Sequence, residues 1–573
     1  MRVFAWFKRC VSVQVVVLFV VGFLIYANSF ANGFFADDYY QIVDNPFIHS
    51  LENIPRFFTG STFYTGGEEL SGNYYKPILT TTFSFLYAIF GMNPSGYHIF
   101  QVFLHILNAT LVYFLCVQYF KKFTSFFLAL LFLTHPINNE VVVYIANLQD
   151  SLFLFFGLSA FIIQKKFSFL FKNIVVGTLL LLSLLSKETG VLFLIIIFAD
   201  QFLHEKKGVR KFLLIGTTVF VIYSVMRFVV AQVFFNTLTT APIMQLSFFD
   251  RMLHIPYIFL YYLKTFFFPI ELIIFQTSVI TSFNFQTFYF PLAIVFLFFS
   301  LAIFLGRISL SSSTKRFRIY LFFCIWFFVG LLPHLQLFPL DGTVADRWFY
   351  FPIIGFLGML AIGVESLYQR FNDIRVLRVI FILLLIITSI FSVRVMIRNT
   401  NWKNQFTLIS HDISINKESY QLEEGYGLEL MKLGKLDDAY PHLLRSTELF
   451  PGVNNLTSLG VYYGRTEQFD LAKKTFLSAM QYDELSLTYE NYALLLLLEN
   501  DFPGLESFCL TATQKFPRSY KLWTFFAVAG AKLSHNESAL QAAKQAYSLR
   551  QDKTREYVLR AIEQNQLIDL TKL

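Results

Sequence analysis

Residues 376–395 read VLRVIFILLLIITSIFSVRV, and residues 433–439 read LGKLDDA. The first segment is apolar over about 20 residues, the length that an α-helix needs to cross a bilayer. The second has the composition of a turn between two amphipathic helices. Because the two patterns stand close together in the chain, we expect the boundary between a membrane domain and a helical-repeat domain near residue 400.

The composition supports a membrane domain before this boundary. Of the 573 residues, 55% are hydrophobic and 15% are charged, whereas soluble domains carry about 25% charged residues. Apolar runs follow one another from Val11 to about Arg398, and the sequence from Trp402 onward is ordinary amphipathic protein. We therefore expect an all-α fold, with a polytopic transmembrane helix bundle in residues 1–400 and an extracytoplasmic α-solenoid in residues 401–573.

Basic residues between the apolar runs predict the orientation, because Lys and Arg are enriched in cytoplasmic loops. Applied here, this rule gives about 11 spans, with the N-terminus inside and the C-terminus outside. The segment Phe249–Ile280 is ambiguous, since Pro256, Pro269 and Glu271 interrupt it. The count of 11 treats it as lying at the outer interface. Because the net charge of +8 resides in such loops, no nucleic-acid partner is expected.

The N-terminus and the cysteines add two further expectations. Arg2, Lys8 and Arg9 precede the first apolar run, as in a signal peptide. The run is longer than a signal core and many spans follow it, which favours an uncleaved first helix. The four cysteines form no close pair, so neither a disulfide framework nor a thiolate metal site is predicted.

The LGKLDDA segment recurs in degenerate form as TEQFDLA (466–472), ENDFPGL (499–505) and LSHNESA (533–539). The interval is about 33–34 residues, the period of tetratricopeptide repeats. The third copy departs most, because Pro503-Gly504 stands where the second helix should begin. Stacked repeats present a concave surface, which favours binding of a protein or peptide partner over a purely stabilising role.

The first outer loop carries adjacent carboxylates in NGFFADDYYQIVDNPFI (32–48). Neighbouring side chains cannot project in the same direction. One of Asp37 and Asp38 can therefore face a substrate while the other holds the loop, a cation or a basic partner. A carboxylate with a raised pKa is a suitable general base for a hydroxyl. The alternative is that both are solvated loop acids.

Other polar residues are expected at the same outer face. Lys187 suits a phosphate as a point charge, and Arg347 suits it as a bidentate donor. The alternatives are a snorkelling lysine paired with Glu188 and an interfacial anchor. His98 and His105 share one helix face, where hydrogen-bonded packing is the alternative to ligand binding.

Six motifs occur in a fixed order: ADDYYQIVDNPFI, YYKPIL, FGMNPSGYHIFQVFLHILNA, LFLTHPINNEVVVYIANLQD, LLSKETGVLF and ADRWFYFPIIG. With the repeats, this series resembles the polytopic glycosyltransferases of the GT-C superfamily. It is most similar to the transmembrane and tetratricopeptide repeat-containing O-mannosyltransferase-like proteins. Each motif alone is weak, but their order is specific and covers nearly the whole chain.

The resemblance implies transfer of a sugar from a polyprenyl-phosphate donor to an acceptor hydroxyl, on protein Ser or Thr, at the extracytoplasmic face. The transfer would invert the anomeric carbon, with Asp37 or Asp38 as general base. The donor phosphate and sugar site would comprise Lys76, His98, His105, Glu140, Lys187, Glu188, Asp346 and Arg347. The chain departs from related sequences at Lys76, where Arg is common, and just before Asp150, where a basic residue is common.

Two other functions stay open. The chain could be a non-catalytic membrane scaffold whose repeats bind partners, or a flippase for lipid-linked sugars. The absence of P-loop, GxGxxG, HExxH and GxSxG patterns in a credible context argues against an ATP-driven pump or a soluble-type hydrolase. No cofactor is predicted with certainty, and a divalent cation stays open. The expected location is the bacterial inner membrane, or the endoplasmic reticulum membrane in a eukaryote, with membrane lipids as partners.

Overall fold

The computed structural model describes residues 13–64, 70–168, 170–205, 208–234, 241–280, 282–371 and 374–572. The basic residues Arg2, Lys8 and Arg9 of the signal-like pattern lie outside this range. The chain divides into two compact units, one formed by Met1–Phe63 with Ser71–Ile415, the other by Asn416–Leu573 with Tyr64–Leu70. They are called the membrane unit and the repeat unit below.

The helices of the membrane unit are α2 (Val13–Tyr26), α3 (Ile54–Phe57), α4 (Pro77–Phe90), α5 (Pro94–Cys116), α6 (Lys122–Thr134), α7 (Asn139–Val143), α8 (Leu148–Lys166), α9 (Lys172–Ser186), α10 (Leu192–His204), α11 (Val209–Ser224), α12 (Pro242–Gln245), α13 (Phe248–Leu253), α14 (Ile255–Phe267), α15 (Phe290–Ser312), α16 (Thr314–Leu331), α17 (Pro352–Phe371), α18 (Ile374–Asn401) and α19 (Gln405–Ile415). Two short strands, β1 (Phe63–Tyr64) and β2 (Leu70–Ser71), pair with each other. The helical, polytopic fold expected from the apolar runs is thus confirmed.

Fewer than 11 of the described helices are long enough to cross a membrane by themselves. Among the described residues, six helices are long and apolar enough to cross a membrane, or seven if the bent pair Lys122–Thr134 and Pro136–Val143 is one span. Four more apolar helices are shorter, among them Val13–Ser29 and Lys172–Ser186. Each of the expected spans contains a helix, but several are too short to qualify alone. The orientation stays a prediction.

The ambiguous segment Phe249–Ile280 is not one continuous helix. It contains α13 and α14, and the chain after Phe267 is largely irregular. Pro256 lies in the first turn of α14, where a proline is tolerated because the N–H that it lacks has no partner inside the helix. Pro269 follows the end of α14. Whether the segment crosses the bilayer stays a prediction.

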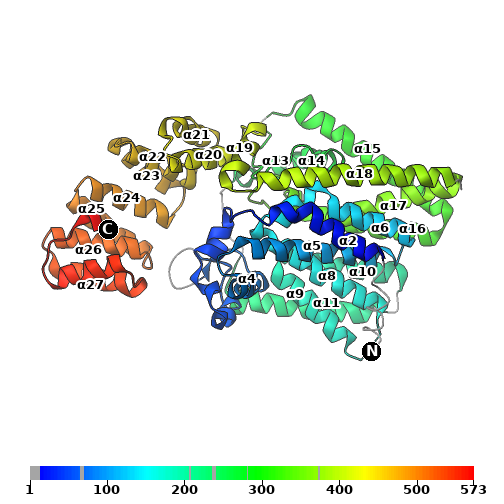
Figure 1. The fold of residues 1–573 in the computed structure, drawn as a ribbon, viewed down its shortest axis with the longest axis horizontal. Coiled ribbons are helices and arrows are strands. Elements are labelled where there is room, and N and C mark those ends of the chain that lie inside the picture. The colour runs from blue at the N-terminus through cyan, green and yellow to red at the C-terminus, as the bar shows by residue number, and fades with distance from the viewer. Residues whose placement is uncertain are drawn as a thin grey trace. The chain divides into compact units, whose positions relative to one another are not determined.

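The most buried of the long apolar helices lie in the N-terminal half of the membrane unit. The span of α5 is 67% buried and that of α8 is 78% buried, whereas those of α15 and α18 are 6% and 11% buried. Figure 1 shows α2, α5 and α18 running along a common direction within this unit. Since many large apolar residues of α15 and α18 are exposed, these helices lie at the border with lipid.

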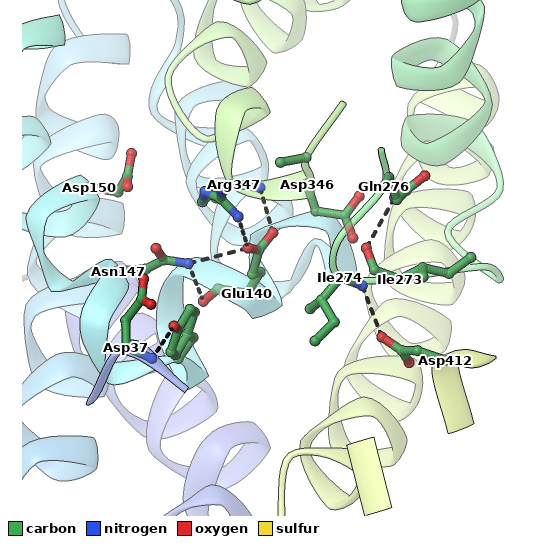
Figure 2. Close-up of polar contacts among 12 residues, drawn as sticks. Asp37, Glu140, Asn147, Asp150, Ile273, Ile274, Gln276, Asp346, Arg347 and Asp412 are labelled. Atoms are coloured by element: carbon green, nitrogen blue, oxygen red, sulfur yellow. Dashed lines mark hydrogen bonds and ion pairs between the residues drawn. The ribbon is translucent and has the colours of Figure 1, made fainter. Parts of the chain in front are cut away.

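The membrane unit extends through α19, past the expected boundary at residue 400. Arg398 near the end of α18 donates to both carboxylate oxygens of Asp412 in α19, at 2.6 and 2.9 Å. Asp412 also accepts the Ile274 N–H at 2.9 Å, as Figure 2 shows. This buried ion pair ties α19 to the helices before it.

The repeat unit is a series of antiparallel helix pairs (Figure 1). Its helices are α20 (Tyr420–Lys432), α21 (Leu436–Leu449), α22 (Val453–Arg465), α23 (Phe469–Tyr482), α24 (Ser486–Leu498), α25 (Phe502–Lys515), α26 (Tyr520–Lys532), α27 (Asn536–Leu549) and α28 (Lys553–Glu563). The atypical third pair is still helical, because Pro503 occupies the first turn of α25 and Asp501 caps the Gly504 N–H at 3.0 Å. The predicted repeat fold is therefore confirmed.

The turn between the two helices of each pair has the same backbone conformation. Gly434, Glu467, Asn500 and Ser534 follow the first helix with φ of 74°, 59°, 60° and 64°. A left-handed residue at this position ends a helix. The four recurring sequence segments are thus four copies of one turn.

Candidate functional site

The two adjacent carboxylates of the loop that follows α2, Asp37 and Asp38, have different surroundings. Asp38 is 1% exposed, and its carboxylate accepts the Phe35 N–H at 2.9 Å and the Ala146 N–H at 2.7 Å. These bonds fix the loop to the 3-10 turn η6 (Ile145–Asn147). Burial raises the pKa of Asp38 well above its usual range, although the two N–H groups oppose the rise. Asp38 is therefore placed to hold the loop.

Asp37 has an exposed side chain. Ala36 before it has a φ of 41°, a left-handed conformation that turns the chain. The Asp37 N–H donates to the Tyr144 hydroxyl at 3.0 Å. Desolvation by the surrounding protein raises the pKa of Asp37 even though the side chain reaches solvent, while the charges of Arg347 and Lys76 oppose the rise. A carboxylate with a raised pKa and access to solvent can act as a base.

Arg347 is held beside Asp37 by an acid of α7. Its guanidinium lies 2.5 Å from Glu140, and its backbone N–H donates to the same carboxylate at 3.1 Å. Figure 2 shows Arg347, Glu140, Asn147 and Asp37 on one side of this group of residues. Burial disfavours the charge on Arg347, but Glu140 outweighs it and raises the pKa further. The guanidinium therefore stays charged.

Asp346 faces away from this group, toward α14 (Figure 2). It is 4% exposed and accepts a hydrogen bond from the Tyr261 hydroxyl. Burial, with the nearby charge of Glu140, raises its pKa to about 8. The sequence grouped Asp346 with Arg347 in the donor site, and the side chains instead diverge. A role for Asp346 in binding the donor stays a prediction that its position does not favour.

Two more cations belong to the same region. Lys187 lies 2.6 Å from Asp150, and the Lys76 ammonium lies 4.1 Å from the centre of the Tyr74 ring. Burial lowers the pKa of Lys76 to about 8, and Glu188 and Asp150 oppose the fall. Lys76 is thus in electrostatic contact with the acids that follow α9 and begin α8.

Glu188 has a different cationic partner from the expected Lys187. It lies 2.7 Å from Arg227, whose guanidinium also contacts the Tyr223 hydroxyl at 3.1 Å. Burial would raise the pKa of Glu188, but Lys76 and Arg227 lower it overall. Arg227 stands alone in an apolar run of the sequence, and a lone charge at such depth is a signal of function or pairing that sequence reasoning missed.

The two histidines of α5 are both buried. His105 is fully buried and contacts the Tyr350 hydroxyl at 2.8 Å and the Leu133 carbonyl at 3.2 Å. His98 is 1% exposed. Both side chains thus lie in the interior of the membrane unit, and their assignment to donor binding stays a prediction.

His334 is a further polar residue near the site that the sequence did not point to. It ends the 3-10 turn η10 (Leu332–His334) and is 8% exposed. Its ring stacks on Trp348 with centres 5.1 Å apart and 10° between the planes. Its Nδ1 is buried without a hydrogen-bond partner, and Lys187 and Arg347 both act on it electrostatically. A buried nitrogen beside two cations is suited to an anion that completes the set.

Among the residues that the structure describes, no three His, Cys, Asp or Glu side chains are placed to hold one metal ion. What the arrangement offers instead is an accessible carboxylate, Asp37, within electrostatic reach of Lys76, Arg347 and the exposed acid Asp341. Lys187 acts on Lys76 in turn. Such a set can take a proton from a hydroxyl and stabilise a phosphate.

Three comparisons with known proteins complement this geometry. No protein-family model matches the chain. Protein O-mannosyl-transferase TMTC3 of Mus musculus is 24% identical over 93% of this chain and 60% of its own length, and the Homo sapiens protein gives the same values. Protein O-mannosyl-transferase TMTC1 of Homo sapiens is 30% identical over 24% of this chain and 16% of its own length. The resemblance expected from the six motifs is confirmed.

The chain spans about 60% of the length of the TMTC3 relatives. Among solved structures, YrrB, described as a TPR protein with an unusual peptide-binding site, matches 29% of this chain and 88% of its own. Its identity is 16% and its TM-score is 0.24, so the tetratricopeptide assignment rests on the helix pairs and turns described above.

Proposed function

We propose that this protein is a membrane glycosyltransferase of the GT-C type. It moves a sugar from a polyprenyl-phosphate donor to a Ser or Thr hydroxyl of a protein, on the extracytoplasmic face, with inversion. The relatives' name, protein O-mannosyl-transferase, supports the class of reaction. The observation that carries the proposal is the exposed carboxylate of Asp37, within electrostatic reach of Lys76 and Arg347.

The chemistry needs one base and one site for the leaving group. Asp37 takes the proton of the acceptor hydroxyl, and the oxygen attacks the anomeric carbon of the donor. The bond from that carbon to the phosphate oxygen breaks, and its electron pair stays on the phosphate. Lys76, Lys187 and Arg347 stabilise the added negative charge, and His334 donates to the phosphate in its Nδ1–H tautomer. Direct displacement needs no second carboxylate and inverts the configuration.

The other groups position these residues. Asp38 fixes the loop through the N–H groups of Phe35 and Ala146. Glu140 and Asp150 orient Arg347 and Lys187. These paired acids lower the net charge of the cluster, so the phosphate enters a site that is cationic only in part.

The repeat unit supplies the acceptor surface in this proposal. Tetratricopeptide arrays bind extended segments on their concave face. The repeats would hold the protein acceptor on the extracytoplasmic side, at the bacterial inner membrane or, in a eukaryote, the endoplasmic reticulum membrane.

The test is sugar transfer by the full chain in lipid nanodiscs, with radiolabelled polyprenyl-phosphate sugars and a lysate of acceptors. Asp37→Asn keeps the shape and removes the base, so transfer should fall about 10²–10⁴-fold. Asp44→Asn is the matched control, because Asp44 is an exposed acid of the same loop. Equal thermal stability of the two variants is required.

Three outcomes would reject the proposal. Full activity of Asp37→Asn would show that Asp37 is not the general base. Lipid-sugar translocation without glycosidic transfer favours the flippase. No transfer with any donor, while the repeats retain a specific partner, favours the scaffold.

A further inference from the structure

Arg227 is a buried charged residue to which the proposed reaction gives no role. It is 1% exposed and lies in the π-helical turn η8 (Val225–Val230) that continues α11. Such turns are rare and are often found at functional sites. The chain then turns back through Gln232, whose φ is 55°, and the Arg227 Nε donates to the Val233 carbonyl at 3.2 Å. The local backbone thus fixes the direction of the guanidinium.

The other two nitrogens of this guanidinium bind two separate segments of the chain. Nη1 donates to the Glu188 carboxylate at 2.7 Å, and Nη2 donates to the Asn73 carbonyl at 3.1 Å. The planar fork of an arginine makes such bonds at the same time and in fixed directions. Arg227 therefore joins the loop at Asn73 to the 3-10 turn η7 (Glu188–Val191).

Each of the joined segments carries a cation of the proposed donor site. Lys76 follows Asn73 by three residues, and Lys187 directly precedes Glu188. The two ammonium groups repel each other, which favours separation of the two segments. A bridge between the segments opposes this separation.

We propose that Arg227 is a positioning residue, which sets the spacing of Lys76 and Lys187 for the phosphate of the lipid donor. The inference rests on the proposed function, because it takes these two lysines as ligands of that phosphate. Arg227 acts through Glu188 and the Asn73 carbonyl and needs no contact with the donor. Binding groups depend on such supporting residues, since a misplacement of about 1 Å costs affinity and rate.

Arg227 also neutralises Glu188, and this has a consequence for Lys76. Burial lowers the pKa of Lys76 to about 8, and the charged groups that act on this lysine are Glu188, Lys187, Asp150 and Asp341. Without the guanidinium, the Glu188 carboxylate can turn toward Lys76, and the closer contact would raise the pKa of Lys76. A change at Arg227 should therefore alter the pH dependence of donor binding, which a general loss of stability would not do.

The test measures binding of radiolabelled polyprenyl phosphate to the full chain in lipid nanodiscs, at pH values below and above the Lys76 pKa. Arg227→Met removes the fork. It should weaken binding about tenfold and move the fall of affinity to higher pH. Arg227→Lys keeps the positive charge but not the fork. It should restore the affinity only in part, while the fall stays near pH 8.

Arg394→Met is the matched control. Arg394 of α18 also donates to two backbone carbonyls, that of Pro269 at 3.1 Å and that of Ile270 at 2.6 Å. Neither of these residues belongs to the candidate site. Arg394→Met should lower the melting temperature but leave the affinity and its pH dependence unchanged. If Arg227→Met does not fold, the weaker affinity of Arg227→Lys still tests the bridge.

The outcomes separate this inference from the proposed function. Full affinity of Arg227→Lys, or of both Arg227 variants, overturns the inference and leaves the proposed function standing. A weaker affinity of Arg227→Met with an unchanged pH dependence also overturns it, because a structural role alone explains that result. No binding of polyprenyl phosphate by the unaltered chain would reject the proposed donor and the inference with it.

Discussion

The polar contacts inside the membrane unit and those inside the repeat unit differ in how far apart in the sequence their partners lie. In the membrane unit, polar contacts join distant parts of the chain: Arg347 and Glu140 are 207 residues apart, and Asn139 and Asn399 are 260 apart. In the repeat unit they join neighbouring repeats, as between Ser458 and Glu424, 34 residues apart. A site built from distant residues fails as a whole, whereas an array of repeats is damaged locally.

The largest expected effect is at the long-range pair. Arg347→Leu leaves Glu140 buried without its cation, which costs about 3–5 kcal/mol when one partner is removed. The whole membrane unit should lose stability, measured as the melting temperature in detergent, and transfer should be lost. The double variant Glu140→Gln/Arg347→Leu removes the buried charge and should recover part of the stability but none of the activity. Equal stability of the single and double variants would contradict this account.

The next effect is local and tests the repeats. A Cβ at Gly460 would lie 2.7 Å from the Phe476 ring, whereas one at Gly464 would meet its nearest neighbour at 3.7 Å. Gly460→Ala should therefore cost about 1–3 kcal/mol through overpacking. Gly464→Ala should be neutral or stabilising by up to about 1 kcal/mol, since Ala favours helix. In Gly460→Ala, hydrogen exchange should show that the loss of amide protection is confined to α22, α23 and their neighbouring helices. A loss of amide protection across the membrane unit would contradict the expectation that damage to a repeat stays local.

A pH effect tests the cation that burial perturbs. The pKa of Lys76 is lowered to about 8, so its charge is present below that pH and lost above it. Donor affinity should fall as pH rises through 8, by up to roughly tenfold per pH unit if Lys76 holds the phosphate. Lys76→Arg keeps the charge and should move this limb to higher pH. Asp346 also has a pKa of about 8, but it faces Tyr261. If the fall in donor affinity stays at the same pH in Lys76→Arg, the titrating group is not Lys76.

The smallest effect concerns the free nitrogen of His334. His334→Phe keeps the stack on Trp348 and removes the donor, so KM for the lipid donor should rise about tenfold, the value of one hydrogen bond to a charged group. His334→Gln retains an N–H and should lose less. A change in kcat alone, with KM unchanged in both variants, would exclude contact with the bound phosphate.

The sequence predicted the positions of the helices, because these depend on local periodicity. Apolar runs placed a helix at every expected span, and the recurring turns placed the helix pairs of the repeats. Length was harder to predict, because Pro136 divides α6 from α7 and several runs give helices of fewer residues than a full span. The membrane unit also runs on through α19, because Arg398 pairs with Asp412.

The site was predicted only in part, because pairing across the chain leaves no local pattern. The sequence indicated that one of Asp37 and Asp38 would hold the loop, and not which. The choice depends on the Ala146 N–H, more than 100 residues away. The partner of Glu188 proved to be Arg227 rather than Lys187, and His334 carries no motif at all. Asp346 and Arg347 are adjacent in sequence but diverge, since one faces α14 and the other faces Glu140.

The contacts of the Asp37 loop impose an order on biosynthesis. Tyr144 and Ala146 bind its backbone and Asp38, and Trp402 packs against both Phe35 and Tyr144, with ring centres 5.6 Å apart in each case. A nascent chain therefore inserts its first helix long before the residues that shape the loop leave the ribosome. The contacts with Tyr144 and Ala146 form only after α7 is made, and the packing of Phe35 on Trp402 forms only after α18 is made.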